Sequence, residues 1–349
     1  MTGRIVCVAL CCIVALPTYG LAQSPAVTPG SYVWSLPRGF PTPAVPADNP
    51  MSVAKVALGR RLFFEPRLSV TGHYSCATCH DPKLAFSDGK PVAIGAVGDP
   101  LPRSAMALVN VAYNISFGWT KRQPGTLESQ MREPLLNTHP VELGLLGRED
   151  SVTALLATDP SYATAFANAF PEPHPVSFDH LIKAIAAFER TLISGDSAFD
   201  RYVFQGDHTA LSAAAKRGMA VFFSRSAGCS SCHAGFNFTG TWRDTEGATG
   251  KPAFARNGVG SEPMRVPTLR NVALTAPYMH DGRFPTLGAV LDHYFGLGDR
   301  AIRYDSRLPR VKADVQQRAD LIAFLNSLTD EEFVRHLASL PSAASASDP

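Results

Sequence analysis

Residues 76–80 read CATCH and residues 229–233 read CSSCH. Both pentapeptides have the form Cys-x-x-Cys-His, which is typical of c-type haem attachment. The spacing follows from the chemistry, because two nearby thiols must reach the two vinyl groups of one porphyrin. The next residue then supplies an imidazole to the iron. The sequence therefore predicts two covalently bound haem c groups.

The use of cysteine favours haem over the two alternatives, a zinc site and a disulfide. Of the 7 cysteines, Cys7, Cys11 and Cys12 fall in an apolar N-terminal segment. The others all belong to the two motifs, as Cys76, Cys79, Cys229 and Cys232. No cysteine of the mature chain is left for another role. We expect His80 and His233 to be the proximal iron ligands.

The N-terminus has the pattern of an export signal. Arg4 precedes an apolar run over 5–17, and the small residues Gly20 and Ala22 follow it. The run is too short to span a bilayer. We therefore expect residues 1–22 to be a signal peptide cleaved near Ala22, with the mature protein in the periplasm. No other segment predicts stable insertion into a membrane.

Composition and charge exclude other classes of partner. The chain has 349 residues, of which 45% are hydrophobic, and its formal net charge is +2. That length suffices for two domains of ordinary size. Neither the charge nor any basic run with interleaved aromatic residues indicates nucleic acid as a partner.

Helical periodicity repeats upstream of the two haem motifs. SVAKVALGRRLFFE (52–65) precedes the first motif, and SAAAKRGMAVFFS (212–224) precedes the second. Further helical patterns cover 151–169, 177–194, 286–296 and 313–327. Sustained period-2 alternation is scarce. This internal repeat predicts a mainly α fold in which two cytochrome c-like haem domains pack together.

The predicted organisation along the chain follows from these patterns. After the signal peptide, a Pro-, Ser- and Ala-rich stretch reads as an irregular leader. The expected segments are a leader over 23–50, a first haem domain over 51–200, a second haem domain over 201–340 and a flexible tail over 341–349.

Three long stretches resemble the bacterial di-haem cytochrome c peroxidases and their relative MauG. They are LGRRLFFEPRLS (58–69), LESQMREPLLNTHPVELG (127–144) and VPTLRNVALTAPYMHDGRFPTLGAVLDHY (266–294). PTPAVPADNPMSVAKV (41–56) is also similar to a MauG-like subgroup that includes the di-haem enzyme of methanobactin operons. The resemblance implies a haem-dependent oxidoreductase that reacts with hydrogen peroxide at the first haem.

The resemblance assigns roles to three residues of the first domain. Glu142 matches an acid over the open face of the first haem, where a carboxylate promotes O–O cleavage by general acid–base catalysis. Gln130 matches a glutamine of the same pocket, and Trp119 matches an indole placed between the two haems. The simpler interpretations are a surface glutamate, an exposed helix residue and a core tryptophan.

Tyr294 is the residue on which the subtype depends. It stands fourteen places after His280, where conventional di-haem peroxidases have a methionine ligand and MauG has a tyrosine. A coordinated phenolate favours oxidised iron. His293 is the rival ligand, but one helical step of about 100° separates the two, so only one can face the iron. Met264 and Met279 are more distant candidates.

The segment after the first motif predicts an open iron face. Conventional relatives have a distal histidine at the position sixteen residues beyond the proximal one, and counting from His80 reaches Ala96. Residues 81–99 contain no His, Met, Tyr or Cys that could replace it. The first haem is therefore expected to be five-coordinate at rest.

The family also implies a calcium ion between the domains. Its ligands here would be the backbone carbonyls of Thr275 and Pro277, with Ser104 at the position of a family asparagine. Oxygen ligands of this kind suit calcium.

Three functions remain open on the sequence. The first is a MauG-like enzyme that stores oxidising equivalents over both haems and oxidises Trp or Tyr side chains of a small exported protein. The second is a conventional peroxidase fed with electrons by a small cytochrome c or cupredoxin. The third is a non-catalytic di-haem electron carrier. Glu142 and Gln130 argue against the third function, and Tyr294 argues against the second.

Overall fold

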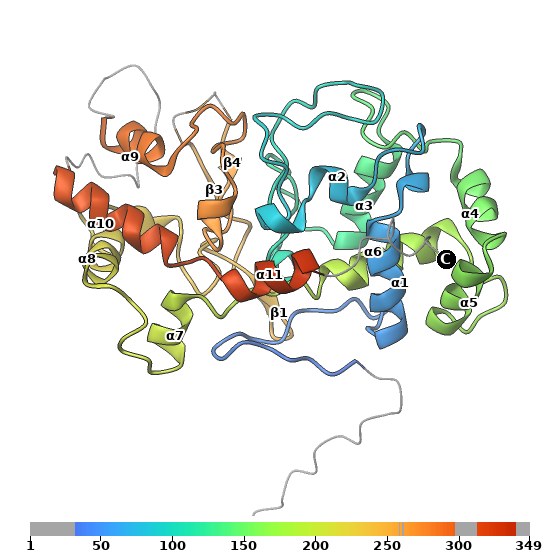
Figure 1. Ribbon diagram of the computed structural model, residues 1–349, viewed down its shortest axis with the longest axis horizontal. Coiled ribbons are helices and arrows are strands. Elements are labelled where there is room, and N and C mark those ends of the chain that lie inside the picture. The colour runs from blue at the N-terminus through green and yellow to red at the C-terminus, as the bar shows by residue number, and fades with distance from the viewer. Residues whose placement is uncertain (1–31, 258, 260–261, 297–312, 340–349) are drawn as a thin grey trace, which may run out of the picture.

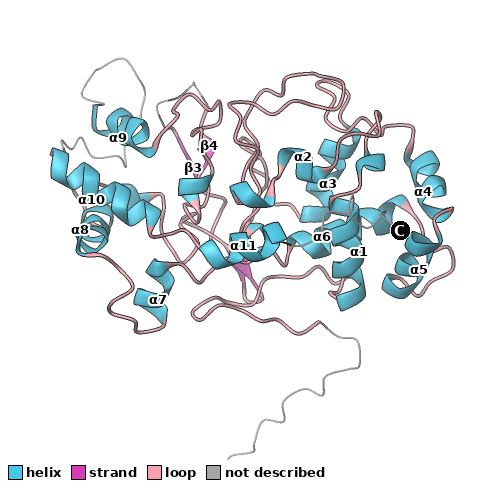
Figure 2. Cartoon of the chain, viewed as in Figure 1, coloured by secondary structure: helices cyan, strands magenta, loops and turns pink. Residues whose placement is uncertain are grey.

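The chain folds mainly into helices joined by long loops. A computed structural model describes residues 32–257, 259, 262–296 and 313–339. Its helices are α1 (Val53–Phe63), α2 (Cys76–Cys79), α3 (Leu127–Leu136), α4 (Glu149–Ala157), α5 (Pro160–Ala169), α6 (Phe178–Glu189), α7 (Ala198–Phe204), α8 (Ala213–Phe222), α9 (Leu287–Gly296), α10 (Val315–Asn326) and α11 (Glu331–Ser339). Figure 2 shows how little strand accompanies them. The predicted mainly α class is confirmed.

The strands form two short antiparallel ladders. One pairs β1 (Arg243–Asp244) with β2 (Gly247–Ala248), and the other pairs β3 (Phe254–Ala255) with β4 (Met264–Arg265). Both ladders lie in the segment between the second haem motif and α9. The second ladder also reaches the second haem motif in space, because β4 and the motif cysteines line the same cavity.

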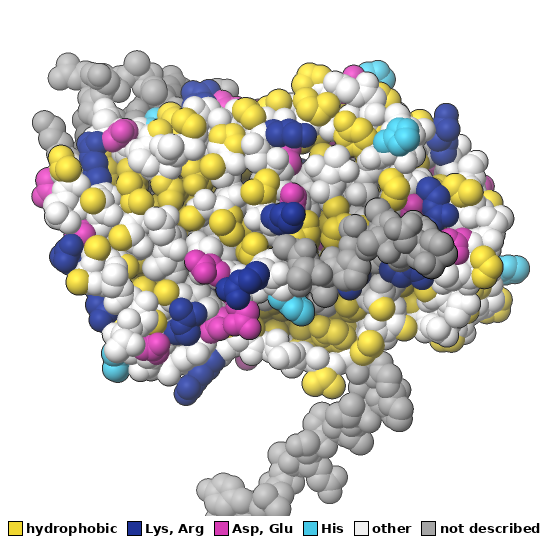
Figure 3. Space-filling view, in the orientation of Figure 1, with side chains coloured by type: hydrophobic (Ala, Val, Ile, Leu, Met, Phe, Trp, Pro, Cys, Tyr) yellow, Lys and Arg dark blue, Asp and Glu magenta, His cyan; other side chains and the backbone are white. Residues whose placement is uncertain are grey.

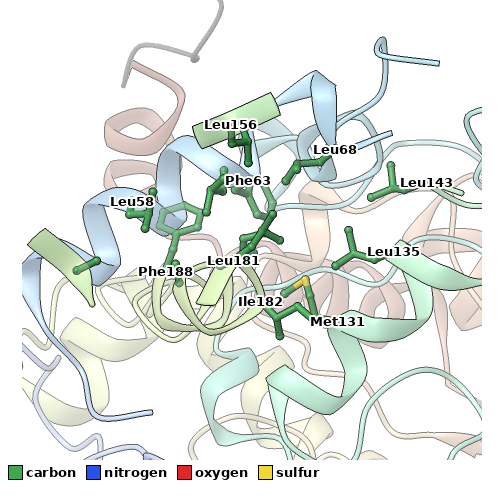
Figure 4. Close-up of a cluster of buried hydrophobic side chains, with 14 of the residues drawn as sticks. Leu58, Phe63, Leu68, Met131, Leu135, Leu143, Leu156, Leu181, Ile182 and Phe188 are labelled. Atoms are coloured by element: carbon green, nitrogen blue, oxygen red, sulfur yellow. The ribbon is translucent and has the colours of Figure 1, made fainter. Parts of the chain in front are cut away.

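The structure has two units, one around each haem motif. The first unit, which contains the first haem motif, is built on the crossing of α1 and α6. A Cβ atom at Gly59 would lie 1.8 Å from the Ala184 carbonyl oxygen, so glycine is what allows the two helix backbones to touch. One turn later, the Phe63 and Phe188 rings meet edge to face with centroids 5.3 Å apart. Figure 4 shows these rings among the leucines of the surrounding core. Burial of this apolar cluster is the main stabilising contribution in this unit.

The second unit repeats the same crossing between α8 and α10. A Cβ atom at Gly218 would lie 1.9 Å from the Asp320 carbonyl oxygen. The Phe222 and Phe324 ring centroids are 5.1 Å apart. Glycine and phenylalanine have the same four-residue spacing in both units. The structure thus shows the predicted internal repeat and adds to each copy a partner helix that follows the haem motif.

Two predicted helices have different limits in the structure. The pattern over 151–169 is two helices, because Asp159 caps α5 and Pro160 occupies its first position. The Asp159 carboxylate accepts a hydrogen bond from the Ser161 amide at 3.0 Å. The pattern over 177–194 ends as a helix at Glu189, and the chain then turns toward the junction of the units.

Buried polar side chains fix the crossing from one unit to the other. Asn110 Nδ2 donates to the Ser194 carbonyl oxygen at 3.0 Å, and Asn271 Nδ2 donates to Ser194 Oγ at 2.8 Å. The Ser194 hydroxyl in turn donates to Asp330 Oδ2 at 3.2 Å. Both asparagines are in the left-handed region and begin equivalent 3-10 turns, so they are also copies in the repeat.

The described part of the N-terminal leader packs against both units. Phe40 is only 8% exposed and meets Phe236 edge to face at 4.7 Å. The Thr245 amide donates to the Thr42 carbonyl oxygen at 3.0 Å. No helix forms over 32–50. The predicted signal peptide (1–22) and tail (341–349) lie outside the described residues.

Acidic and basic side chains are interspersed over the face seen in Figure 3. Within the described part of the chain, no helix is long and apolar enough to cross a bilayer. The C-terminal helix α11 returns to the first unit, where Phe333 packs against the apolar core around Phe63 and Phe188.

Candidate haem-binding and redox site

The histidine of each Cys-x-x-Cys-His motif is held by a backbone carbonyl. His80 Nδ1 donates to the Phe86 carbonyl oxygen at 2.8 Å, and His233 Nδ1 donates to the Phe238 carbonyl oxygen at 2.9 Å. Phe86 and Phe238 have φ values of 61° and 53°, which turn these carbonyls back toward the imidazoles. The proton is thereby fixed on Nδ1, and Nε2 keeps the lone pair that an iron ligand needs.

The electrostatics of the two imidazoles also favour iron binding. Burial is the main cause that lowers the pKa of both His80 and His233, while the backbone carbonyls oppose it. A second carbonyl acts on each ring, from Met106 for His80 and from Pro267 for His233. A neutral imidazole is the ligand form.

The motif cysteines form no disulfide with one another; Cys232 is buried, and the other three are partly buried. Burial raises the pKa of Cys79 and of Cys229 to about 11 in each case. Apolar surroundings cause this effect and also suit the edge of a porphyrin. In the part of the chain that the structure describes, no cluster of His, Cys, Asp or Glu is arranged to hold a metal ion on its own.

A cavity of about 240 Å³ adjoins the second motif. Cys229, Cys232 and His233 form part of its lining, together with Tyr294 from α9. The first unit contributes Trp119 and the segment 104–107 to the same cavity. The lining is mainly apolar. The second haem site is therefore shared between the two units.

The structure places Tyr294, and not His293, in this cavity. Burial raises the pKa of Tyr294 well above its usual range, with a smaller effect from the Cys232 and Cys229 thiols. His293 Nε2 lies 2.8 Å from the Asn257 carbonyl oxygen, and its ring packs against Phe284 with centroids 5.0 Å apart. The two neighbours thus face different surroundings, as helical geometry requires.

Three methionines also line the cavity, and two of their sulfur atoms have donors. Met106 Sδ accepts from Arg265 at 3.1 Å, and Met279 Sδ accepts from Asn257 at 3.6 Å. Met264 is 5% exposed. Among the sulfur ligands considered from sequence, Met264 is therefore the remaining rival of Tyr294.

Glu142 lies beside the first haem motif and beside Ala96. The Ala96 amide donates to the Glu142 carbonyl oxygen at 2.7 Å. Gly95 makes this approach feasible, since a Cβ atom there would lie 1.8 Å from the Val141 carbonyl oxygen. The charge of Glu142 contributes to the raised pKa of Cys79, which places the carboxylate near the motif. Ala96, at the position where conventional relatives have a distal histidine, thus lies next to Glu142.

The Glu142 carboxyl group is half-buried and has one hydrogen-bond partner. Asn137 Nδ2 donates to Glu142 Oε1 at 3.4 Å. Burial raises the pKa of Glu142, and the hydrogen bond from Asn137 opposes that rise. Gln130 lies on the same stripe of α3, two turns before Asn137. Among the hydrogen bonds of the described residues, Glu142 is linked to Asn137 and not to Gln130.

Trp119 is anchored where the units meet. Its Nε1 donates to the Ser104 carbonyl oxygen at 2.9 Å, and its ring lies edge-on to His280 at 6.3 Å. The Ser104 amide donates to the His280 carbonyl oxygen at 2.8 Å. An indole of the first unit is thus held against the second unit and lines the second haem cavity.

Comparisons with known proteins agree with this geometry. The model of the di-haem cytochrome c peroxidase family matches residues 53–209. MauG, a methylamine utilization protein of Methylorubrum extorquens, is 39% identical over 309 residues, covering 85% of this chain and 84% of that protein. The chain belongs to the di-haem cytochrome c peroxidase and MauG family. It is therefore a haem-dependent oxidoreductase.

Two further relatives represent both branches of this family. Cytochrome c551 peroxidase of Pseudomonas aeruginosa is 34% identical over 300 residues, covering 81% of each chain. A crystal structure of a MauG-like protein associated with microbial copper homeostasis aligns with a TM-score of 0.81 at 34% identity, covering 87% of this chain and 97% of that one. The comparisons thus confirm the predicted family and the predicted fold of two cytochrome c-like haem domains.

The residues present fit two haem c groups. Each site offers two thiols that are not joined in a disulfide and an imidazole whose Nε2 is available, in an apolar setting. The family to which the chain belongs carries two such groups. Cys76, Cys79 and His80 are thus the residues that would hold the first haem, and Cys229, Cys232 and His233 those that would hold the second.

Ser104, Thr275 and Pro277, the residues expected at a calcium ion, line one cavity. Ser104 Oγ donates to the Met279 carbonyl oxygen at 3.0 Å, which links this serine to the second unit. Within the described lining, no aspartate or glutamate accompanies them. The set therefore offers neutral oxygen atoms only.

Sequence reasoning missed Asn137 and Arg265. A signal for Asn137 existed, because it stands seven residues after Gln130 and five before Glu142. Arg265 precedes a matched stretch by one residue, but nothing in the pattern showed that its side chain is buried at the cavity.

Proposed function

We propose that this protein uses hydrogen peroxide to oxidise Trp or Tyr side chains of a small exported partner protein, as a MauG-like enzyme. The observation that carries the proposal is the placement of Tyr294 in the second haem cavity, on α9, while His293 packs elsewhere. A tyrosine ligand favours the oxidised state of the iron, which suits an enzyme that withdraws electrons from a protein.

The first site supplies the proton chemistry in this proposal. When bound, the first haem provides an iron centre that reacts with peroxide. The Glu142 carboxylate accepts a proton from the incoming peroxide and returns a proton to the departing oxygen. Asn137 orients the carboxylate through its bond to Oε1. Ala96, whose amide donates to the Glu142 carbonyl oxygen, has no side-chain atom that could bind iron.

Trp119 supports communication between the two sites. Its indole lines the second cavity while its backbone belongs to the first unit. An aromatic π system at this position shortens the electron path between the haems. The hydrogen bond from Nε1 to the Ser104 carbonyl holds the ring in one orientation.

The partner and the compartment belong to the same proposal. We expect the signal peptide over 1–22 to direct the chain to the periplasm, where a small exported protein would meet it. The relatives do not fix the identity of the partner protein, since one is a methylamine utilization protein and another is a MauG-like protein associated with microbial copper homeostasis.

Calcium binding between the units is a further part of the proposal. Asp88 Oδ2 is buried without a hydrogen-bond partner, and the neighbouring Gly89 faces the Ala276 carbonyl oxygen. A cation near Thr275 and Pro277 would balance this carboxylate. Elemental analysis of the dialysed protein should find calcium, and Asp88→Asn should lower the calcium content. Equal calcium in both proteins would remove Asp88 from the site.

The proposed function is tested by comparing two uses of peroxide. The resting diferric protein receives peroxide together with either a reduced small cytochrome c or the small exported protein encoded by a neighbouring gene. We expect mass spectrometry to find oxidised Trp or Tyr in the exported protein. The reduced cytochrome should be oxidised only slowly. Met264→Leu should preserve the modification, and Tyr294→His should abolish it.

The alternative is a conventional cytochrome c peroxidase, which the 34% identity with the Pseudomonas aeruginosa enzyme favours. Fast oxidation of the cytochrome by the pre-reduced protein, without any modified side chain, would establish that alternative. The non-catalytic electron carrier is not supported, because the family consists of enzymes.

A further inference from the structure

Arg265 is a buried cation at the wall of the second haem cavity. It lies on β4, is 9% exposed and lines the cavity together with His233 and Trp119. Its Nε donates to the Gly118 carbonyl oxygen at 3.1 Å, and one terminal nitrogen contacts Met106 Sδ at 3.1 Å. Neither acceptor carries a charge. The guanidinium is thus held in place without neutralisation.

Other buried arginines of the described chain have carboxylate partners. Arg270 forms two hydrogen bonds of 2.8 Å with Asp200, and Arg190 lies 2.7 Å from Glu128. Arg265 has no carboxylate partner among the ion pairs of the described residues. Burial lowers its pKa to about 10, which still leaves it charged at neutral pH. A buried cation without a neighbouring anion is destabilising, so we expect an anion to bind beside Arg265.

The cavity itself shows which anion is missing. Within the described lining, Arg265 is the single lysine or arginine, and no aspartate or glutamate is present. Haem carries two propionate carboxylates, and the second haem belongs to this cavity through Cys229, Cys232 and His233. Guanidinium binds carboxylate through a fork of parallel N–H donors.

We propose that Arg265 binds a propionate of the second haem and fixes that edge of the haem against Trp119. The contact to the first unit is already formed by the protein, because the Arg265 amide donates to the Trp119 carbonyl oxygen at 2.8 Å. One residue thus neutralises the haem edge and connects it to the loop that carries the indole.

This role has an electrostatic consequence for the second haem. Ferric haem has one more positive charge than ferrous haem, so a nearby cation disfavours the ferric state. In an apolar cavity this interaction is screened less than in water. Arg265 therefore raises the reduction potential of the second haem, and it opposes the effect of a tyrosine ligand. Loss of the cation should lower the potential of this haem alone.

The test is a spectroelectrochemical titration of the holoprotein, with Arg265→Gln, Arg265→Lys and Arg243→Gln as variants. Arg243 is the matched control, since it also donates to a carbonyl of the first unit, Gly125 at 3.1 Å, but does not line the cavity. We expect Arg265→Gln to shift the oxidation equilibrium of the second haem at least tenfold toward ferric, a change of about 59 mV. Arg265→Lys should keep most of the wild-type potential, and Arg243→Gln all of it.

The proposal is wrong if Arg265→Gln, with both haems attached, has wild-type potentials or shifts both haems equally. Should Arg265→Gln lose the second haem, recovery of that haem in Arg265→Lys would support a charge role. Failure of Arg265→Lys to attach it would overturn that role. These outcomes do not depend on whether the enzyme modifies a partner protein, because no substrate is present in the titration.

Discussion

Replacement of Glu142 by glutamine changes the proposed proton transfer with little change in packing. Glutamine has nearly the same volume, and its carbonyl oxygen can still accept the hydrogen bond that Asn137 donates to Oε1. What disappears is the group that takes and returns a proton. General acid–base catalysis contributes about 10²- to 10⁴-fold, or about 2.7–5.5 kcal/mol of activation free energy. We expect the reaction with peroxide to slow by that factor.

The raised pKa of Glu142 determines how the rate of the reaction with peroxide should depend on pH. Burial raises the pKa of Glu142 above that of an ordinary carboxyl, and Asn137 partly offsets the rise. The ionised form is the proton acceptor, so the wild-type rate should increase with pH through this raised pKa and then level off. Asn137→Ala removes a long hydrogen bond of about 1 kcal/mol, which moves the rise to higher pH by less than about one unit.

Stopped-flow mixing of the diferric protein with peroxide, in a single turnover between pH 4 and 9, measures both effects. Glu133→Gln is the control, because Glu133 lies one turn before Asn137 on α3 and contacts Lys121. It should behave as wild type. A Glu142→Gln protein that binds both haems and reacts at the wild-type rate would refute the role of this carboxyl group, as would an unchanged pH profile.

Three other substitutions test the first unit. Ala96→His should convert the first haem to a low-spin form and slow its reaction with peroxide, because the residue lies beside Glu142; an unchanged optical spectrum would show that position 96 does not face the iron. Gly59→Ala should destabilise the fold by about 3 kcal/mol in urea unfolding. The control is Gly288→Ala, whose added Cβ meets ordinary contacts and which should stay within about 1 kcal/mol of wild type. Equal effects of the two substitutions would contradict the close helix crossing. Glu189 is 7% exposed, and burial raises its pKa to about 8. The stability that its protonated form contributes should be complete below about pH 4.5 and lost as pH rises through 8, so Glu189→Gln should gain about 3.5 kcal/mol on wild type between pH 5 and 8. Parallel stability curves for the two proteins would refute this.

The haem motifs and the repeated helices could be predicted from sequence because their signals are local. Thiol spacing, the position of the histidine and the apolar period all lie within a few residues of one another. The same is true of Tyr294 and His293, which one helical step separates. For these features the sequence contains the geometry directly.

Contacts between distant segments could not be predicted in this way. The crossing of Gly59 with Ala184, and that of Gly218 with Asp320, become visible only when the helices are packed. Arg265 is similar, since an arginine in a short strand is ordinarily exposed. Its burial depends on Gly118 and Met106, which belong to the other unit. The split of the predicted helix at Asp159 and Pro160 was a local signal that apolar periodicity alone did not detect.

We expect the first haem to have an open iron face and the second haem to have Tyr294 as its ligand. Optical and electron paramagnetic resonance spectra of the resting diferric holoprotein, recorded before and after peroxide, test it most directly. We predict one high-spin and one low-spin haem, with immediate reaction and no prior reduction, and a low-spin signal that Tyr294→His alters and Met264→Leu does not. Two low-spin haems at rest, reactive only after partial reduction, would show that the first haem has a distal ligand.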